Sequence, residues 1–69
     1  TKLDIAWIGR IGDFKIHILN YTLEKLSNQA LNNKTFINFH VIGDGEFSKD
    51  LNLNLENKYF KIILYFIKS

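Results

Sequence analysis

The hydrophobic residues of this chain change their spacing twice within its first 42 residues, which limits the folds open to it. Residues 3–8 are short and apolar and stop at Gly9, as a buried strand does. In residues 14–30 the apolar positions recur at helical spacing instead. Residues 35–42 return to β-branched and aromatic types and stop at a Gly-Asp-Gly turn. This order predicts two parallel strands joined by a helical crossover.

The helical segment is amphipathic in sequence, with one stripe expected to face a sheet and the other to face water. The inward stripe comprises Ile18, Leu19, Thr22, Leu23, Leu26 and Ala30. The outward stripe comprises Asn20, Glu24, Ser27 and Asn28. Asp13 is expected to be the N-cap, because an Asp carboxylate can accept hydrogen bonds from amides of the first turn.

The remaining segments complete a β-α-β-α-β pattern. Residues 46–57 favour a short helix, since Phe47, Leu51 and Leu55 have helical spacing, although Leu51, Leu53 and Leu55 also alternate as in a strand. Residues 59–67 are rich in aromatic and β-branched types and predict a third strand. We therefore expect an α/β fold, one half of a doubly wound, Rossmann-like parallel three-stranded sheet with its strands in chain order. Apolar side chains on both faces of residues 35–42 predict that helices cover both sides.

Length and composition restrict what such a half can do alone. With 69 residues and no cysteine the chain forms one small domain of marginal stability without disulfides, and two histidines without cysteine partners disfavour a zinc site. The net charge of +2 is spread along the chain, which argues against a nucleic-acid surface. No apolar run is long enough to span a bilayer, and no signal peptide is visible, so a cytoplasmic setting is expected. An open edge on the first strand suggests a fragment of a larger domain and self-association through that edge.

The chemistry is expected at the carboxyl ends of the strands, where ligands of open α/β sheets bind. Gly9, Arg10 and Gly12 follow the first strand, and Lys15 lies in the first helical turn. The two cations would flank amides that carry partial positive charge, which makes a diphosphate cradle. The loop has neither the Gly-Lys-Ser/Thr ending of an NTPase nor the three-glycine spacing of an NAD-binding enzyme. From spacing alone, solvated loop charges beside a tight turn are the more common case.

Two short sequence motifs favour the diphosphate cradle over solvated loop charges. The segment "WIGRIGDFK", followed by a helix, a strand and "VIGDGE", resembles the start of the C-terminal domain of the family-four, GT-B-fold glycosyltransferases. Members of that family typically have a strand ending in Gly-Arg, a Lys five residues after the Arg, an amphipathic helix and a strand ending in Gly-Asp-Gly-Glu or Gly-Asp-Gly-Pro. The resemblance covers about residues 5–51. It departs at Ile16, where the family usually has Gly after the Lys.

The resemblance implies a retaining transfer of sugar from a UDP- or GDP-linked donor, in bacterial surface-polysaccharide or lipopolysaccharide assembly. Arg10 and Lys15 would hold the donor diphosphate and stabilise the leaving nucleoside diphosphate, with Gly43, Asp44 and Gly45 in a loop close to the donor. No cofactor, metal or catalytic residue is expected within these residues. The acidic motif that engages the donor sugar and the domain that binds the glycan or lipid acceptor would lie outside them, so the segment alone is not expected to turn over. The full enzyme would be cytoplasmic or peripheral at the inner membrane face.

The alternative is a non-catalytic binding or interaction module with a flavodoxin-like or receiver-like half fold. A receiver domain should carry an acidic cluster after its first strand, where this chain has Gly9 and Arg10. For Asp44 and Glu46, local roles in a turn and at a helix start are the more common case.

Histidines and aromatic residues are expected to be structural. His17 and His40 would be packed or surface side chains and not bases. Core packing explains the aromatic residues better than base stacking does, because no basic stripe accompanies them. These residues are Trp7, Tyr59, Phe60, Tyr65 and Phe66.

Overall fold

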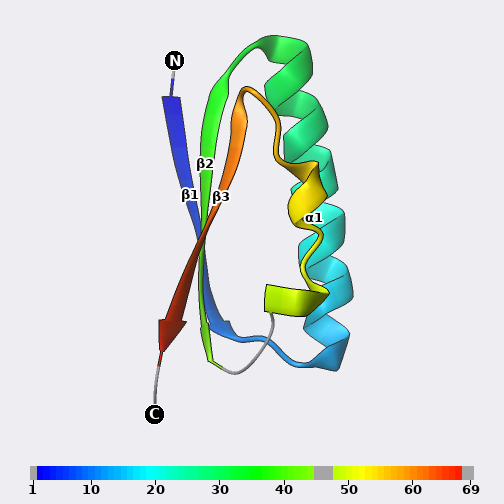
Figure 1. The fold of residues 1–69 in the computed structure, drawn as a ribbon, viewed down its shortest axis with the longest axis vertical. Coiled ribbons are helices and arrows are strands. Elements are labelled where there is room, and N and C mark those ends of the chain that lie inside the picture. Colours follow the sequence, from blue (N-terminus) through cyan, green and yellow to red (C-terminus); the bar gives the residue numbers. More distant parts are fainter. Residues whose placement is uncertain (1, 45–47, 68–69) are drawn as a thin grey trace.

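The structure is a three-stranded parallel sheet with one α-helix packed on one side (Figure 1). This computed structural model describes residues 2–44 and 48–67. Its elements are β1 (Lys2–Arg10), α1 (Asp13–Asn33), β2 (Phe36–Asp44), the 3-10 helices η1 (Ser48–Asp50) and η2 (Leu53–Leu55), and β3 (Phe60–Ile67). The strand order β1-β2-β3 confirms the predicted Rossmann-like half. None of the helices in the described ranges is long and apolar enough to cross a membrane.

The register of the strands aligns their carboxyl ends. β1 and β2 pair from Lys2 opposite Phe36 to Arg10 opposite Asp44, with Gly9 opposite Gly43. β3 continues the same alignment along the other edge of β2. The loops that follow β1 and β2 therefore leave the sheet at the same end.

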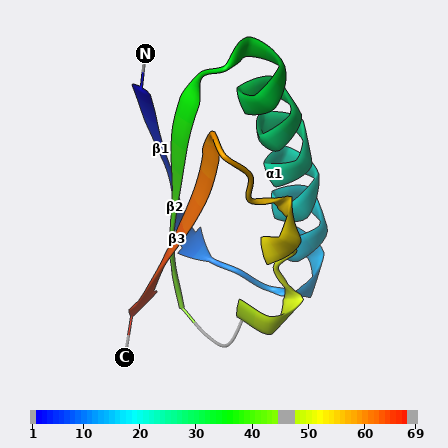
Figure 2. The same cartoon turned by 45° about the horizontal axis from the view of Figure 1, so that its top comes forward.

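The hydrophobic core lies between the sheet and α1. Phe39 and Val41 of β2 and Phe60 of β3 are buried against Leu19 and Leu23 of α1. Figure 2 shows α1, η1 and η2 on the same side of the sheet. The expectation that helices cover both faces is wrong for this chain, because both connections between strands cross the same face.

The buried stripe of α1 is rotated from the predicted one. Ser27 is only 6% exposed, although it was expected to face water, whereas Ile18 is 48% exposed. The cause is the segment after β2, which packs along one flank of the helix. The Ser27 hydroxyl donates to the Leu55 carbonyl at 2.6 Å, and Asn57 Nδ2 donates to the Ser27 hydroxyl at 3.0 Å. The inward helix surface thus includes polar residues that bond to this segment.

Asn20 makes a second link of the same kind. Its Nδ2 donates to the Asp50 carbonyl at 2.9 Å, and its Oδ1 accepts from the Asn52 amide at 2.9 Å. One side chain therefore satisfies a backbone acceptor and a backbone donor in the connection between β2 and β3. This explains why Asn20, predicted to be solvated, belongs to the packed flank of α1.

Helix α1 begins at Asp13, so its N-cap is Gly12, one residue before the predicted cap. Gly12 occupies the N-cap position with φ −96° and ψ 177°, and no side chain caps the amides. The prediction of Asp13 as N-cap is therefore wrong, since Asp13 is the first helical residue. The extended backbone of Gly12 is the conformation that an N-cap residue needs. At the other end, Lys34 adopts the left-handed conformation, with φ 52°, that commonly ends a helix.

The second connection contains two 3-10 turns where a short α-helix was predicted. Asparagine side chains compete with helical hydrogen bonding, which favours turns. Asn57 Oδ1 accepts from the amides of Tyr59 at 2.8 Å and Phe60 at 3.0 Å, and Glu56 Oε2 accepts from the Ile62 amide at 2.9 Å. Two amides of the edge strand β3 are thus satisfied by side chains of the preceding loop, which blunts this edge.

Replacing Ser27 with Ala should lower the free energy of unfolding by about 1–2 kcal/mol, because it leaves the partly buried Leu55 carbonyl without its side-chain donor and removes one of the two acceptors of Asn57 Nδ2. Urea unfolding followed by circular dichroism measures the change. Asn28→Ala is the matched control, since Asn28 is the exposed neighbour on the same helix. An equal, small effect of both substitutions would contradict the role of Ser27.

Candidate functional site

The predicted cationic loop and the start of α1 enclose a hollow at the carboxyl end of β1. Its volume is about 300 Å³, and the described residues that line it are Arg10, Gly12, Phe14 and Lys15. This volume is at the lower end of the range of small-molecule sites. Arg10 comes from the end of β1 and the other three from the helix start, so the short turn between the two elements sets their separation.

The backbone at this hollow offers hydrogen-bond donors. The Gly12 carbonyl accepts from the amides of Lys15 at 3.1 Å and Ile16 at 3.2 Å, which closes the first turn. The amides of Asp13 and Phe14 precede these bonds and have no partner inside the helix. Together with the helix dipole they carry partial positive charge. The hollow therefore has the backbone character of an anion site.

Two full positive charges add to this potential. Arg10 and Lys15 are exposed, and neither forms an ion pair with a side chain that the structure describes. Arg10 lies opposite Asp44 in the strand ladder, so one acidic residue belongs to the same end of the sheet. The side chain of Asp44 is not among those described. An anion in the hollow would meet two cations that bond to no other described group.

Phe14 is a lining residue that sequence reasoning missed. It lies in the first turn of α1 between Asp13 and Lys15, and its side chain is 81% exposed. An exposed aromatic beside two cations gives the hollow one apolar wall. The sequence could have indicated this role, because Phe14 directly follows Asp13 at the start of the helix. An aromatic residue at the start of an amphipathic segment is expected to pack against the core, so Phe14 was not considered as a lining residue.

The predicted second loop is only partly at the hollow. Gly43 lies opposite Gly9, so the ends of β2 and β1 are neighbours in the sheet. Among the described residues, Gly9, Gly43 and Asp44 do not line the hollow. Gly45 and Glu46 lie outside the described ranges. The structure therefore brings Arg10 and Lys15 together and leaves Gly43 and Asp44 as neighbours of Gly9 and Arg10 in the sheet.

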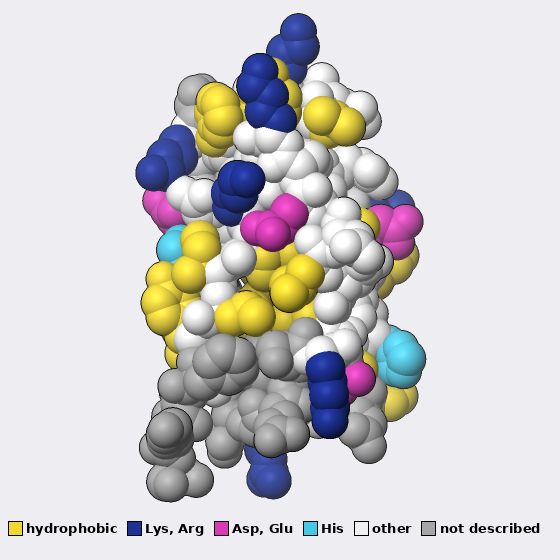
Figure 3. Space-filling model, in the orientation of Figure 1, with side chains coloured by type: hydrophobic (Ala, Val, Ile, Leu, Met, Phe, Trp, Pro, Cys, Tyr) yellow, Lys and Arg dark blue, Asp and Glu magenta, His cyan; other side chains and the backbone are white. Residues whose placement is uncertain are grey.

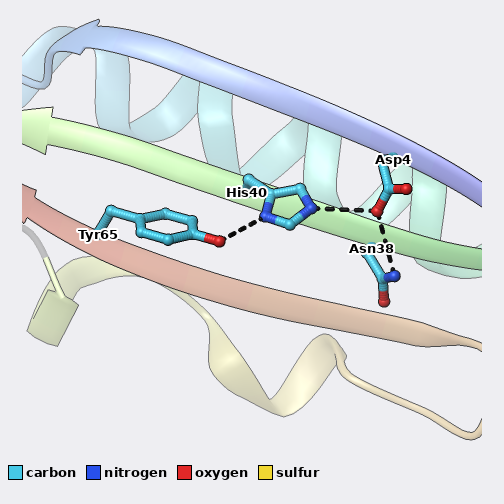
Figure 4. Close-up of polar contacts among 4 residues, drawn as sticks. All are labelled: Asp4, Asn38, His40 and Tyr65. Carbon is cyan, nitrogen blue, oxygen red and sulfur yellow. Dashed lines mark hydrogen bonds and ion pairs between the residues drawn. The ribbon is translucent and has the colours of Figure 1, made fainter.

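A second polar cluster lies on the sheet face opposite α1 (Figure 4). His40 Nε2 is 3.2 Å from Asp4 Oδ1, and His40 Nδ1 is 2.9 Å from the Tyr65 hydroxyl. Asn38 Nδ2 donates to the same Asp4 oxygen at 3.2 Å. The rings of His40 and Tyr65 also stack, with centroids 5.7 Å apart. Each strand thus contributes to one connected network.

The network changes the acidity of Asp4. Hydrogen bonds from His40 and then Asn38 lower the pKa of the Asp4 carboxyl below its ordinary value of 3.8, outweighing slight desolvation that acts in the opposite direction. Strand alternation places Asp4, His40 and Tyr65 on one face, but only the register shows that they meet. Sequence reasoning therefore treated His40 as an isolated residue.

The other expected structural residues separate into two groups. Trp7 is half-buried against the core and Phe60 is fully buried, as predicted. Tyr65 is 42% exposed and belongs to the network, so core packing is the wrong explanation for it. His17 is exposed on α1. Residues 2–44 and 48–67 contain no group of three His, Asp or Glu side chains placed to hold a metal.

Comparison with known proteins finds no similar protein. The chain matches no known protein family, and no curated protein or solved structure is significantly similar to it. Interpretation of the hollow therefore depends on its geometry and on the two short motifs of the sequence.

Gly9 should be intolerant of a side chain although there is space for one. Its φ of +151° is rarely adopted by L-residues, while an added Cβ would meet no atom within 4 Å. Gly9→Ala is therefore expected to lower the free energy of unfolding by about 1–3 kcal/mol through backbone strain alone. Gly12→Ser is the control, because its N-cap conformation accepts a side chain and Ser should stabilise the helix by about 0.3 kcal/mol. Equal effects on the urea midpoint would contradict this difference.

The Asp4 network should contribute to stability at neutral pH and lose that contribution in acid. Because the folded-state pKa of Asp4 lies below 3.8, its ionised form stabilises the fold above that pH, and the contribution is lost as the pH falls through the folded-state pKa. Asp4→Asn should therefore be less stable than the wild type at neutral pH, with the difference narrowing below about pH 4. Urea unfolding across this range tests it, with Glu24→Gln as the exposed-carboxyl control. A difference that does not depend on pH would contradict the role of ionised Asp4.

Proposed function

We propose that this chain is the donor-binding part of a retaining glycosyltransferase, in which Arg10 and Lys15 bind the diphosphate of a nucleoside-diphosphate sugar. The observation that carries the proposal is the convergence of these two cations on one hollow beside the free amides of a helix start. The "GRIGDFK" and "VIGDGE" motifs support the same assignment from the sequence. The acceptor would be a glycan or lipid of a bacterial surface polymer, bound by another part of the enzyme.

A diphosphate suits this arrangement better than a single small anion does. It carries charge on two phosphoryl groups, and the hollow offers two cations from different elements. Arginine presents a planar fork that can bond two phosphate oxygens, whereas lysine provides a compact charge on a flexible chain. Arg10 would therefore fix the orientation of one phosphate, and Lys15 would follow the other. The amides of Asp13 and Phe14 would supply further donors.

Phe14 would contribute apolar contact to the rest of the donor. Its exposed ring borders the same hollow as the two cations, so a ligand held by its phosphates would extend past it. Covering an aromatic side chain is favourable in proportion to the apolar area removed from water. A nucleotide or sugar ring could therefore gain affinity here that inorganic diphosphate cannot.

The same cations would assist the chemical step. When the glycosidic bond to the donor breaks, negative charge increases on the departing phosphate. Cations already positioned there stabilise that charge more in the transition state than in the ground state, which accelerates the reaction. The described residues that line the hollow would bind the donor and stabilise the charge of the leaving group, and the proposal assigns acceptor binding to another part of the enzyme.

A non-catalytic flavodoxin-like or receiver-like module is the competing function. Such a module could use the same helix start to bind phosphate, without any preference for a nucleoside. The two proposals differ in the contribution that the nucleoside makes to affinity, which is measurable on the 69-residue chain.

Titration of the ¹⁵N-labelled chain with UDP or GDP should shift the amides from Gly9 to Lys15. Arg10→Ala and Lys15→Ala should each weaken binding about tenfold, which corresponds to one charged hydrogen bond at an exposed site. Lys25→Ala on the outer surface of α1 is the control and should bind like the wild type. The folded state of each variant is checked by its dispersed amide spectrum.

Inorganic diphosphate, titrated in parallel, separates the two functions. Tighter binding of UDP or GDP than of diphosphate supports the donor site, and Phe14→Ala should reduce that difference. Equal binding of all three supports an anion-binding module instead. The absence of any shift at millimolar nucleotide, on the order of the weakest specific affinities, would contradict both.

A further inference from the structure

One face of the sheet has no cover among the described residues. By strand alternation the middle of this open face consists of three rows, with one residue from each strand in a row. Lys2 and Phe36 lie beyond one end of these rows, and Arg10 lies beyond the other. The rows are Asp4-Asn38-Lys61, then Ala6-His40-Ile63, then Ile8-Ile42-Tyr65. Ile8 is 73% exposed, and none of the three isoleucines packs against the core. Parallel sheets are normally covered on both sides. A partner that covers the isoleucines of this face would therefore remove apolar surface from water.

The left margin of Figure 3 is the side of the sheet away from α1. From top to bottom it carries basic, acidic, histidine and hydrophobic side chains in turn. Within the three rows, Asp4 and Lys61 therefore lie at one end and Ile8 and Ile42 at the other.

The polar groups in the middle of the open face are already paired with one another. Asp4 Oδ1 has two hydrogen-bond partners, and both ring nitrogens of His40 lie near a partner atom. Covering a polar group costs most when it is left without a hydrogen bond. Because this network is internal to the face, a second layer could cover it without having to supply matching groups. Burying this face should thus cost less desolvation free energy than burying the same polar residues without these hydrogen bonds.

We propose that two copies of this chain pack face to face through the open face, related by a two-fold axis parallel to the strands. Such an axis places β1 of one copy over β3 of the other, and β2 over β2, with all strands running in the same direction. Rows then meet equal rows. Asp4 faces Lys61 of the second copy, and the reverse pair forms by symmetry. Ile8 likewise faces Tyr65 of the second copy.

This self-complementarity is the argument for a second copy as the occupant. A two-fold interface brings the same patch together from both chains, so each favourable contact occurs twice. Here the row that contains charge pairs Asp4 with Lys61. The middle row places Ala6 opposite Ile63 and His40 opposite the second His40, and the last row is apolar apart from the Tyr65 hydroxyl. Packed sheets are rotated by about 30°, which displaces the outer contacts by a few ångströms, within the reach of a lysine side chain. The proposal does not depend on the function of the hollow.

The size of the open face sets the strength of the dimer. Three strands about 4.8 Å apart and about 30 Å long give a footprint of roughly 400 Å² per copy. The total of about 800 Å² lies below the range of stable interfaces. The dissociation constant is therefore expected on the order of 0.1 mM.

Sedimentation of the 69-residue chain between roughly 10 µM and 1 mM should show a reversible monomer–dimer equilibrium. Asp4→Lys and Lys61→Asp should each weaken dimerisation at least about tenfold, because each brings two like-charge pairs together. An equimolar mixture of the two variants should dimerise again, since both pairs are then of opposite charge. Lys61→Asp leaves the Asp4–His40 network intact, so its effect does not depend on the stability of the monomer.

Matched charge changes on α1 control for net charge. Glu24→Lys and Lys25→Asp alter the net charge by the same amounts on the far side of the chain, and both should dimerise like the wild type. A monomer at every concentration would overturn the proposal. A dimer that tolerates both Lys61→Asp and Ile8→Lys would also overturn it and would indicate pairing through the open edge of β1. Failure of the mixture to restore dimerisation would exclude the two-fold arrangement.

Discussion

The parallel register of β1 and β2 is the constraint on which the rest of the structure depends. It is held by α1, whose Leu19 and Leu23 pack on Phe39 and Val41 and so keep the crossover on one face. Because parallel strands share a carboxyl end, the same register puts Arg10 next to the turn into α1 and brings Gly9 and Gly43 side by side. The position of the hollow thus follows from core packing and not from a separate folding element. A loss of packing under α1 would separate the cations as well as destabilise the chain.

The second connection decides what the other face of the sheet can do. Its asparagines and the flank of α1 that carries Asn20 and Ser27 exchange hydrogen bonds, which holds the connection on the covered side. Both crossovers therefore stabilise one face, and no layer covers the other face in the part of the chain that the structure describes. Glu56 and Asn57 also satisfy amides of β3, so the two edges of the sheet are unequal. Among the described residues β1 keeps an open edge, and the face opposite α1 keeps the exposed Ile8 beside the half-buried Ile42 and Ile63.

Hydrophobic spacing was sufficient to predict the three strands and the long helix, because each depends on which residues avoid water. The strand order followed from the rules for crossovers between parallel strands. It failed where hydrogen bonds compete with hydrophobicity. Ser27 is buried because Leu55 and Asn57 bond to it, and no periodicity reveals that partner. The same holds for the turns at Ser48–Asp50 and Leu53–Leu55, where side chains bond to backbone in place of a helix. Asp4, His40 and Tyr65 lie 36 and 25 residues apart in sequence, so only the register could connect them.

The hollow and the open face are formed mostly by different elements, because three of the four described residues that line the hollow belong to the start of α1. Gly12, Phe14 and Lys15 belong to the α1 side, whereas the Asp4–His40 network faces away from it. Arg10 is the exception, since strand alternation places it on the same side of β1 as Ile8, at the border of the proposed interface. Two sites are coupled only when a ligand binds two states of the protein with different affinity. Among the described residues that line the hollow, Arg10 alone lies on the open-face side, so any effect of nucleotide on the dissociation constant of the dimer would act through Arg10.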